Sequence, residues 1–121
     1  MKTENVIVDK SKAFALRIIK LYKYLCDTKK EFVLSKQLLR CGTSIGANVK
    51  EAIRGQSLAD FRAKMSIALK EASETEYWLE LLHESSFLSD EEFDSIIADC
   101  IELLKILTSI INTSGKEEHN A

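Results

Sequence analysis

The chain contains no proline, and its four glycines stand at positions 42, 46, 55 and 115. Between Gln56 and Ser114 neither proline nor glycine occurs. In a helix interior, proline is less favourable than alanine by about 3 kcal/mol and glycine by about 1 kcal/mol. A sequence that avoids both over such long stretches favours long helices, so we expect an all-α fold.

Apolar residues recur at helical spacing in four segments, which we place at residues 9–26, 32–54, 58–84 and 90–113. Ser57 stands where the third helix needs an N-cap, and Ser89 with Glu92 forms a capping box before the fourth. The connections are short, so consecutive helices must run antiparallel. The sequence predicts a single domain, residues 1–121, folded as an antiparallel up-down-up-down four-helix bundle.

Glycines also mark expected ends and contacts of these helices. Gly55 stands where the second helix would end, and Gly115 where the fourth would end, which leaves a polar tail over 116–121. Gly42 and Gly46 lie one turn apart inside the second helix, where glycine is unfavourable. We expect a neighbouring helix to approach them closely; a functional kink is the alternative.

The charges divide sharply along the chain. Residues 1–70 hold 15 Lys and Arg against 6 Asp and Glu, a net of +9, whereas residues 71–121 hold 2 against 13, a net of −11. Such asymmetry indicates either polyanion binding or complementary packing between halves or subunits. The candidate nucleic-acid-binding residues lie on the first two helices: Arg17, Lys20, Lys23, Lys36, Arg40, Lys50 and Arg54. The alternative is a solvated bundle exterior.

The third and fourth helices carry more apolar surface than a bundle core requires. A core-facing stripe takes about a third of a helix, yet the fourth helix is apolar over about half its circumference at 100° per residue. A second stripe on the third helix includes Trp78. We therefore predict self-association through Ile67, Tyr77, Trp78, Leu81, Leu103, Ile106 and Ile110. The alternative is that Trp78 folds over the rim of the bundle.

No motif indicates catalysis or a cofactor. Glu80 and His83 have the Glu-x-x-His spacing of di-iron bundles, but such a site needs two of these motifs, and the other histidine is His119 in the tail. We expect no metal site, no cofactor and no enzyme activity. Three cysteines at positions 26, 41 and 100 are expected to be buried free thiols. With no signal peptide or membrane span recognisable, a cytoplasmic location is the default.

Two blocks of the sequence resemble a known family. The stretch LSKQLLRCGTSIGANVKEA, residues 34–52, and the stretch IALKEASETEYWLELL, residues 67–82, are similar to the 23S rRNA intervening-sequence proteins, also called the four-helix bundle protein family. The resemblance implies a homopentameric bundle. It also implies a relation to the accessory protein of diversity-generating retroelements, which is associated with nucleic acid and reverse transcriptase.

Within the first block, four polar residues follow one side of the second helix at 4-4-3 spacing: Arg40, Ser44, Asn48 and Glu51. They predict a polar ridge, either a hydrogen-bonded network at a helix or subunit contact or a binding surface with Arg40 on phosphate. Our leading hypothesis is a non-enzymatic homo-oligomer that binds rRNA or other nucleic acid. The alternative is a protein-interaction scaffold that binds no nucleic acid; no membrane or small-molecule substrate is expected.

Overall fold

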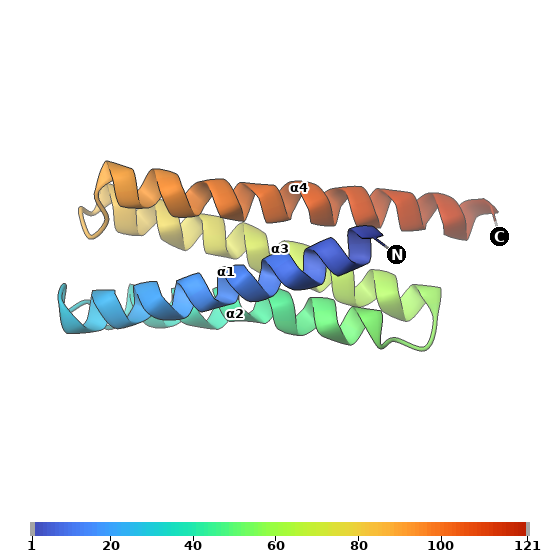
Figure 1. Ribbon diagram of the computed structural model, residues 1–121, viewed down its shortest axis with the longest axis horizontal. Helices are drawn as coiled ribbons and strands as arrows, with labels where there is room; N and C mark the ends of the chain where they lie inside the picture. The colour runs from blue at the N-terminus through green and yellow to red at the C-terminus, as the bar shows by residue number, and fades with distance from the viewer. Residues whose placement is uncertain (1, 121) are drawn as a thin grey trace.

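The computed structural model describes the backbone of residues 2–120 and the side chains of residues 5–116. Over this range it contains four helices and no strand: α1 (Lys2–Asp27), α2 (Leu34–Ile53), α3 (Leu58–Glu84) and α4 (Asp90–Asn120). The helices lie side by side along one long axis (Figure 1). The predicted all-α, antiparallel four-helix bundle is confirmed.

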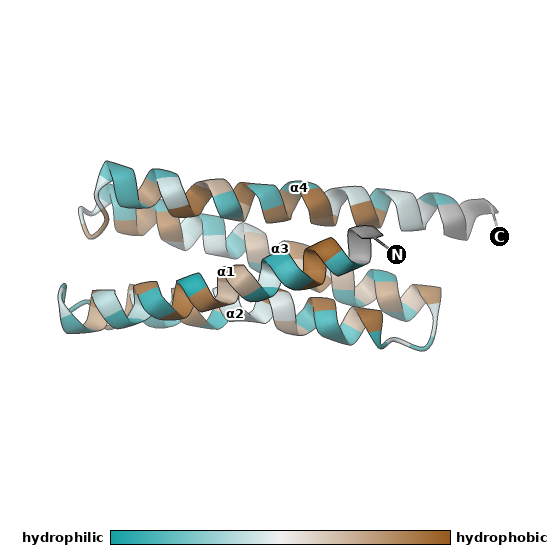
Figure 2. Ribbon diagram, viewed as in Figure 1, coloured by the Kyte–Doolittle hydropathy of each residue, from teal (hydrophilic) through white to brown (hydrophobic). Residues whose placement is uncertain are grey.

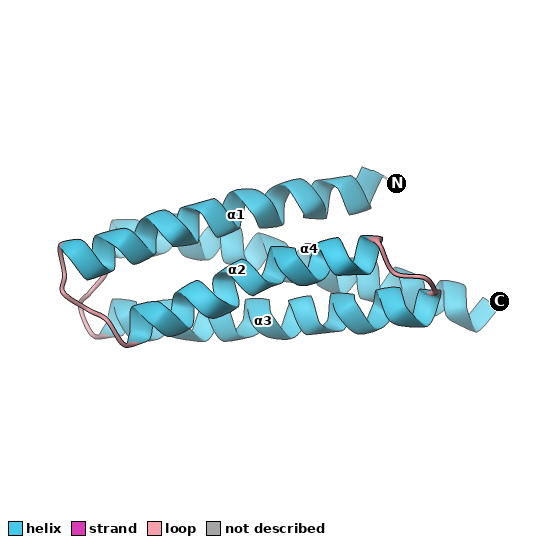
Figure 3. Cartoon of the chain, turned by 90° about the horizontal axis from the view of Figure 1, so that it is seen from below, coloured by secondary structure: helices cyan, strands magenta, loops and turns pink. Residues whose placement is uncertain are grey.

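The four helices form a ring of neighbours, in which α1 packs against α2 and α4, and α3 packs against α2 and α4. The α1–α2 and α3–α4 turns lie together at one end of the bundle, and the α2–α3 turn lies at the other end with both chain termini (Figure 1). In the perpendicular view, α1 and α2 both slant relative to α3 (Figure 3).

The core lies along the axis between the four helices. Apolar residues recur along each ribbon and alternate with polar ones (Figure 2), as expected of helices buried on one side. All four helices contribute fully buried side chains, the largest being Phe14, Ile7, Ile18, Leu25, Leu38, Ile45, Met65, Leu79, Leu82, Leu103, Leu107 and Val49. No helix within the described residues is long and apolar enough to cross a membrane.

The helix starts combine predicted and unpredicted caps. Ser57 Oγ accepts the Asp60 N–H at 3.0 Å, and the capping box forms as expected, with Ser89 N–H donating to Glu92 Oε1 at 2.8 Å and Glu92 N–H to Ser89 Oγ at 3.1 Å. The cap of α2 was not predicted. The buried Glu31 carboxylate accepts the backbone N–H groups of residues 33, 34 and 35 at 2.8, 2.7 and 2.9 Å.

Burial and hydrogen bonding act in opposite directions on Glu31. Burial alone would raise the pKa of this carboxyl group, but the backbone N–H groups of Ser35, Leu34 and Val33 stabilise its charged form. The net result is a pKa below its ordinary value of 4.5. Glu31 therefore holds the α1–α2 turn and the start of α2 together as a carboxylate.

The ends of the bundle differ from the predicted boundaries. The first helix begins at Lys2 and not at Asp9, and its added turns bring Ile7 into the core with no exposed surface. The fourth helix continues through Gly115 to Asn120, so the predicted stop at this glycine was wrong, and residues 116–120 of the predicted polar tail are helical. One glycine weakens a helix by only about 1 kcal/mol, which the rest of a long helix tolerates.

Of the two glycines inside α2, Gly42 shows the predicted close approach of a neighbouring helix. A Cβ on Gly42 would lie 2.8 Å from Ile18 Cγ1 and 2.9 Å from Ile18 Cγ2. Gly46 faces Ser11, whose backbone and side-chain oxygens would each lie 3.4 Å from such a Cβ. The α2 helix passes through both positions without interruption. Contact with α1, and not a kink, therefore accounts for glycine at position 42.

Candidate nucleic-acid interface

Six of the seven predicted basic residues are exposed, and five of these lie outside the ion pairs that the described residues form. Lys20 and Lys23 lie on α1, Lys36 and Lys50 lie on α2, and Arg54 is the C-cap of α2. Their positions alternate with core residues at helical spacing, so the same amphipathic pattern that buries Ile18 and Ile45 turns these cations outward. Within the described residues, none of the five has an ion-pair partner. Their charges are available to an external anion.

Arg17 lies in a different environment, because it turns toward α4. Its Nη1 donates to Asp99 Oδ2 at 2.6 Å and to the Ser95 carbonyl oxygen at 3.3 Å, and its Nη2 donates to Ser95 Oγ at 2.9 Å. About two helical turns before Arg17, Lys10 Nζ lies 3.2 Å from Glu102 Oε2. These pairs join the basic α1 to the acidic α4 within one chain. Part of the predicted complementarity between halves is therefore intramolecular.

Arg40 is likewise engaged, by two acids of α3. Its guanidinium contacts the Glu74 carboxylate, and its Nη1 lies 3.6 Å from Glu71 Oε2. The indole Nε1 of Trp78 donates to Glu74 Oε2 at 3.0 Å. The Trp78 hydrogen bond, and after it the Arg40 contact, lower the pKa of Glu74 against the opposing effect of burial. Arg40 therefore links α2 to α3, and its charge is paired with acids of the same chain.

The rest of the polar ridge makes hydrogen bonds within α2 and one ion pair to α3. Asn48 Nδ2 donates to the carbonyl oxygen of Ser44 at 2.9 Å and to its Oγ at 3.0 Å. Glu51 Oε2 lies 3.1 Å from Lys64 Nζ of α3. Of the two interpretations of the ridge, a hydrogen-bonded network at a helix contact is the one that these distances favour.

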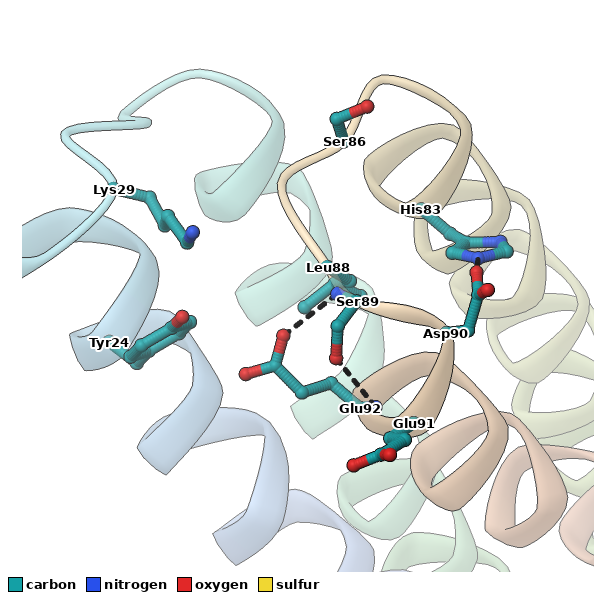
Figure 4. Close-up of a pocket in the computed structure, with 9 residues that line it drawn as sticks. All are labelled: Tyr24, Lys29, His83, Ser86, Leu88, Ser89, Asp90, Glu91 and Glu92. Carbon is teal, nitrogen blue, oxygen red and sulfur yellow. Dashed lines mark hydrogen bonds and ion pairs between the residues drawn. The ribbon is translucent and has the colours of Figure 1, made fainter.

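A hollow of about 720 Å³ lies at the end of the bundle where the two turns meet. Figure 4 shows Tyr24 and Lys29 on one side of it and His83 and Asp90 on the other. His83 Nε2 lies 2.6 Å from Asp90 Oδ1, and its ring stacks on Phe93 with centroids 4.2 Å apart. The histidine of the Glu-x-x-His motif therefore holds the start of α4 against the end of α3.

The remaining candidate groups are possible metal ligands and the three cysteine thiols. Among the described residues there is no group of three or more His, Cys, Asp or Glu placed to hold a metal ion. Cys41 and Cys100 are buried, and Cys26 is half-buried. Burial raises the pKa of the Cys100 thiol to about 12, and it also raises the pKa of Cys41. Both buried thiols are therefore protonated at neutral pH and poor nucleophiles.

The comparisons with known proteins decide the family. The family model described as 23S rRNA-intervening sequence protein matches residues 3–109. The chain belongs to this family. The chain is similar to a protein with unknown function from the S23 ribosomal protein family of Bacteroides thetaiotaomicron VPI-5482, whose crystal structure was solved at 1.70 Å resolution. The two are 56% identical, with a TM-score of 0.90, and the match covers 91% of this chain and 98% of that chain. No curated protein matches the chain.

The residues predicted to form an oligomer interface lie in two environments. Ile67 and Tyr77 are exposed, at 40% and 54%, and Trp78, Leu81 and Ile106 are half-buried. In contrast, Leu103 and Ile110 are 1% and 7% exposed within the core of their own chain. These two side chains therefore leave little surface for contact with a second copy.

Other exposed apolar residues of this family member were not among the predicted contacts. Leu16 on α1 is 60% exposed, and Phe32 and Val33 in the α1–α2 turn are 57% and 73% exposed. Leu16 interrupts the basic face of α1 between Lys12 and Lys20, so the helical wheel carried the signal for it. Phe32 and Val33 were expected inside the second helix, at 32–54, whereas α2 begins at Leu34 and leaves both in the turn.

Proposed function

We propose that this chain is a non-enzymatic subunit of a homo-oligomer, a pentamer, that binds rRNA or other nucleic acid through the outer basic face of α1 and α2. The observation that carries the proposal is the set of five exposed cations without an ion-pair partner among the described residues. They are Lys20, Lys23, Lys36, Lys50 and Arg54. The family name and its link to 23S rRNA support the choice of ligand.

The spacing of these cations suits an extended polyanion. At about 1.5 Å rise per residue, Lys36 and Lys50 lie about 21 Å apart along α2. A duplex strand advances by about 3.4 Å per phosphate, so this distance corresponds to about six phosphates. A small anion would contact one end of the face only, whereas a nucleic acid would contact cations along its length.

A salt titration of RNA binding tests this proposal. Each phosphate contact to a single strand contributes about −0.7 to the slope of log K against log salt, so five contacts predict a slope of about −3.5. We expect the Lys20→Gln, Lys23→Gln, Lys36→Gln triple variant to reduce the magnitude of that slope by about 2. The matched control removes three charges elsewhere, by Lys70→Gln, Lys105→Gln and Lys116→Gln. Equal weakening in both variants would refute a localised interface.

Light scattering tests the assembly. The chain has a mass of 13.7 kDa, and the proposed pentamer has five times that mass. The exposed Ile67 and Tyr77 support self-association, because apolar side chains gathered at the surface mark contact sites. A Tyr77→Glu, Ile67→Glu variant should shift the mass toward that of a monomer. A monomeric wild type at micromolar concentration would contradict this part of the proposal.

A protein-interaction scaffold is the second candidate, favoured by the net charge of −11 over residues 71–121. In that arrangement, acids of α3 and α4 of one copy cover the basic face of the next. The two candidate functions differ in RNA binding and in the effect of salt on the assembly. The scaffold would bind no RNA at low salt, and its subunits would dissociate as salt screens the contact.

A further inference from the structure

A second hollow, with a volume of about 520 Å³, lies between the end of α2 and the start of α3. Five residues line it: Ala47, Lys50, Glu51 and Arg54 of α2 and its C-cap, and Lys64 of α3. Three of the five are cations and one is an acid. Cationic residues from two neighbouring helices therefore border the hollow, and not only residues of one helix.

The fold brings these residues together through the α2–α3 turn. Lys50 and Arg54 lie one turn apart at the end of α2, so both follow the same side of the helix. The chain then reverses, and α3 begins at Leu58 and carries Lys64 back alongside α2. There Lys64 Nζ lies 3.1 Å from Glu51 Oε2. The small side chain of Ala47 leaves room between the aliphatic stems of the long side chains.

The charge of this hollow suits a phosphate group. Lys50, Arg54 and Lys64 supply three positive charges, and Glu51 removes one, which leaves a net of +2. Arginine and lysine are the usual donors to phosphate, since guanidinium and ammonium groups offer several N–H donors each. The hollow at the other end of the bundle does not share this property, because Asp90, Glu91 and Glu92 line it together with Lys29 and His83.

We propose that the hollow formed by Lys50, Arg54 and Lys64 binds a phosphate group. When that phosphate belongs to a nucleic acid, the inference rests on the proposed function and adds Lys64, which the sequence did not single out. A free phosphate or phosphate monoester offers the same chemistry. Glu51 limits the affinity, because its carboxylate pairs with Lys64 and repels the incoming anion.

Variants that remove positive charge and a variant that removes negative charge test this site. The double variant Lys50→Gln, Arg54→Gln should weaken binding of a labelled single-stranded RNA and reduce the magnitude of its salt slope by about 1.4. Glu51→Gln should strengthen binding of inorganic phosphate by roughly threefold, since it releases an exposed ion pair. The matched control is Lys70→Gln, Lys105→Gln. Far-UV circular dichroism of each variant checks that these exposed substitutions leave the helices intact.

The possible outcomes separate the site from the proposed function. If RNA binding persists and the double variant equals the control, the hollow is not a phosphate site although the proposed function stands. If RNA does not bind, but inorganic phosphate binds with the expected response to the variants, the proposed function fails and the site remains. Absence of binding for both probes, or weaker phosphate binding by Glu51→Gln, would overturn the inference.

Discussion

Replacing Gly42 with alanine would force a methyl group into the closest contact between α1 and α2. The new Cβ would lie 2.8 Å from Cγ1 and 2.9 Å from Cγ2 of Ile18, whereas carbon atoms in favourable contact lie about 3.5–4.0 Å apart. Ile18 has no exposed surface, and branching at Cβ restricts its rotation in a helix. Neither rotation nor displacement of this side chain relieves the clash cheaply.

Two opposing effects set the size of the change. Overpacking a core costs about 1–3 kcal/mol, and a contact between two branched carbons of a buried residue falls at the upper end. Alanine in place of glycine stabilises a helix by about 1 kcal/mol. We therefore expect Gly42→Ala to lower the free energy of unfolding by about 2 kcal/mol.

Gly46→Ala is the matched control, one turn along the same helix. Its Cβ would lie 3.4 Å from the backbone and side-chain oxygens of Ser11, which is ordinary contact. The helix-propensity gain then remains, so this variant should be as stable as the wild type or more stable by up to about 1 kcal/mol. The same chemical change is thus expected to have opposite signs at two neighbouring glycines.

Urea unfolding followed by circular dichroism, at one fixed protein concentration, measures both variants. A double-mutant cycle with Ile18→Ala identifies the cause, because this change removes both Cγ atoms. In the Ile18→Ala background, Gly42→Ala should no longer destabilise the protein. The reasoning is refuted if Gly42→Ala is as stable as the wild type, or if the loss is unchanged without the isoleucine.

Three further predictions concern the caps and the thiols. Glu31→Gln should destabilise the fold by about 1–3 kcal/mol in chemical unfolding, because a charged acceptor of three N–H groups is lost. Since the folded-state pKa of Glu31 is lowered from 4.5, its stabilisation is present above that pH and is lost as pH falls through the folded-state value; the variant should lose less stability than the wild type in acid. Ser57→Ala should lower stability by about 1 kcal/mol, and Ser57→Asp should restore it. In peptide mapping after iodoacetamide treatment at pH 8, Cys26 should be modified before Cys41 and Cys100; prior labelling of Cys100 would contradict its burial.

The fold followed from local chemistry to a large extent. The absence of proline, the apolar spacing and the serine caps are properties of short segments, and they placed α3 at its observed bounds. The close approach at Gly42 was also predictable, because an unfavourable glycine in a helix calls for a compensating contact. These inferences needed no knowledge of which helix is the neighbour.

The candidate site was predictable only in part, since it depends on pairs between helices. Arg17 and Arg40 share a basic pattern with Lys20 and Lys36, yet acids more than 30 residues away neutralise the two arginines. Lys64 joins Lys50 and Arg54 only after the chain reverses. A single sequence gives the side of a helix on which a charge lies, but it does not give the partner on the next helix.

The order of the helices has a consequence for how the chain folds. Three of the four helix contacts join consecutive helices, and the fourth, between α1 and α4, is the sparsest. Such a low contact order is typical of chains that fold within microseconds to milliseconds. It also places the α1–α4 seam late in folding, because closing it costs the entropy of bringing distant segments together. In hydrogen exchange, we expect the amides of α1 and α4 to open before those of α2 and α3, because α2 and α3 share the densest contact of the bundle.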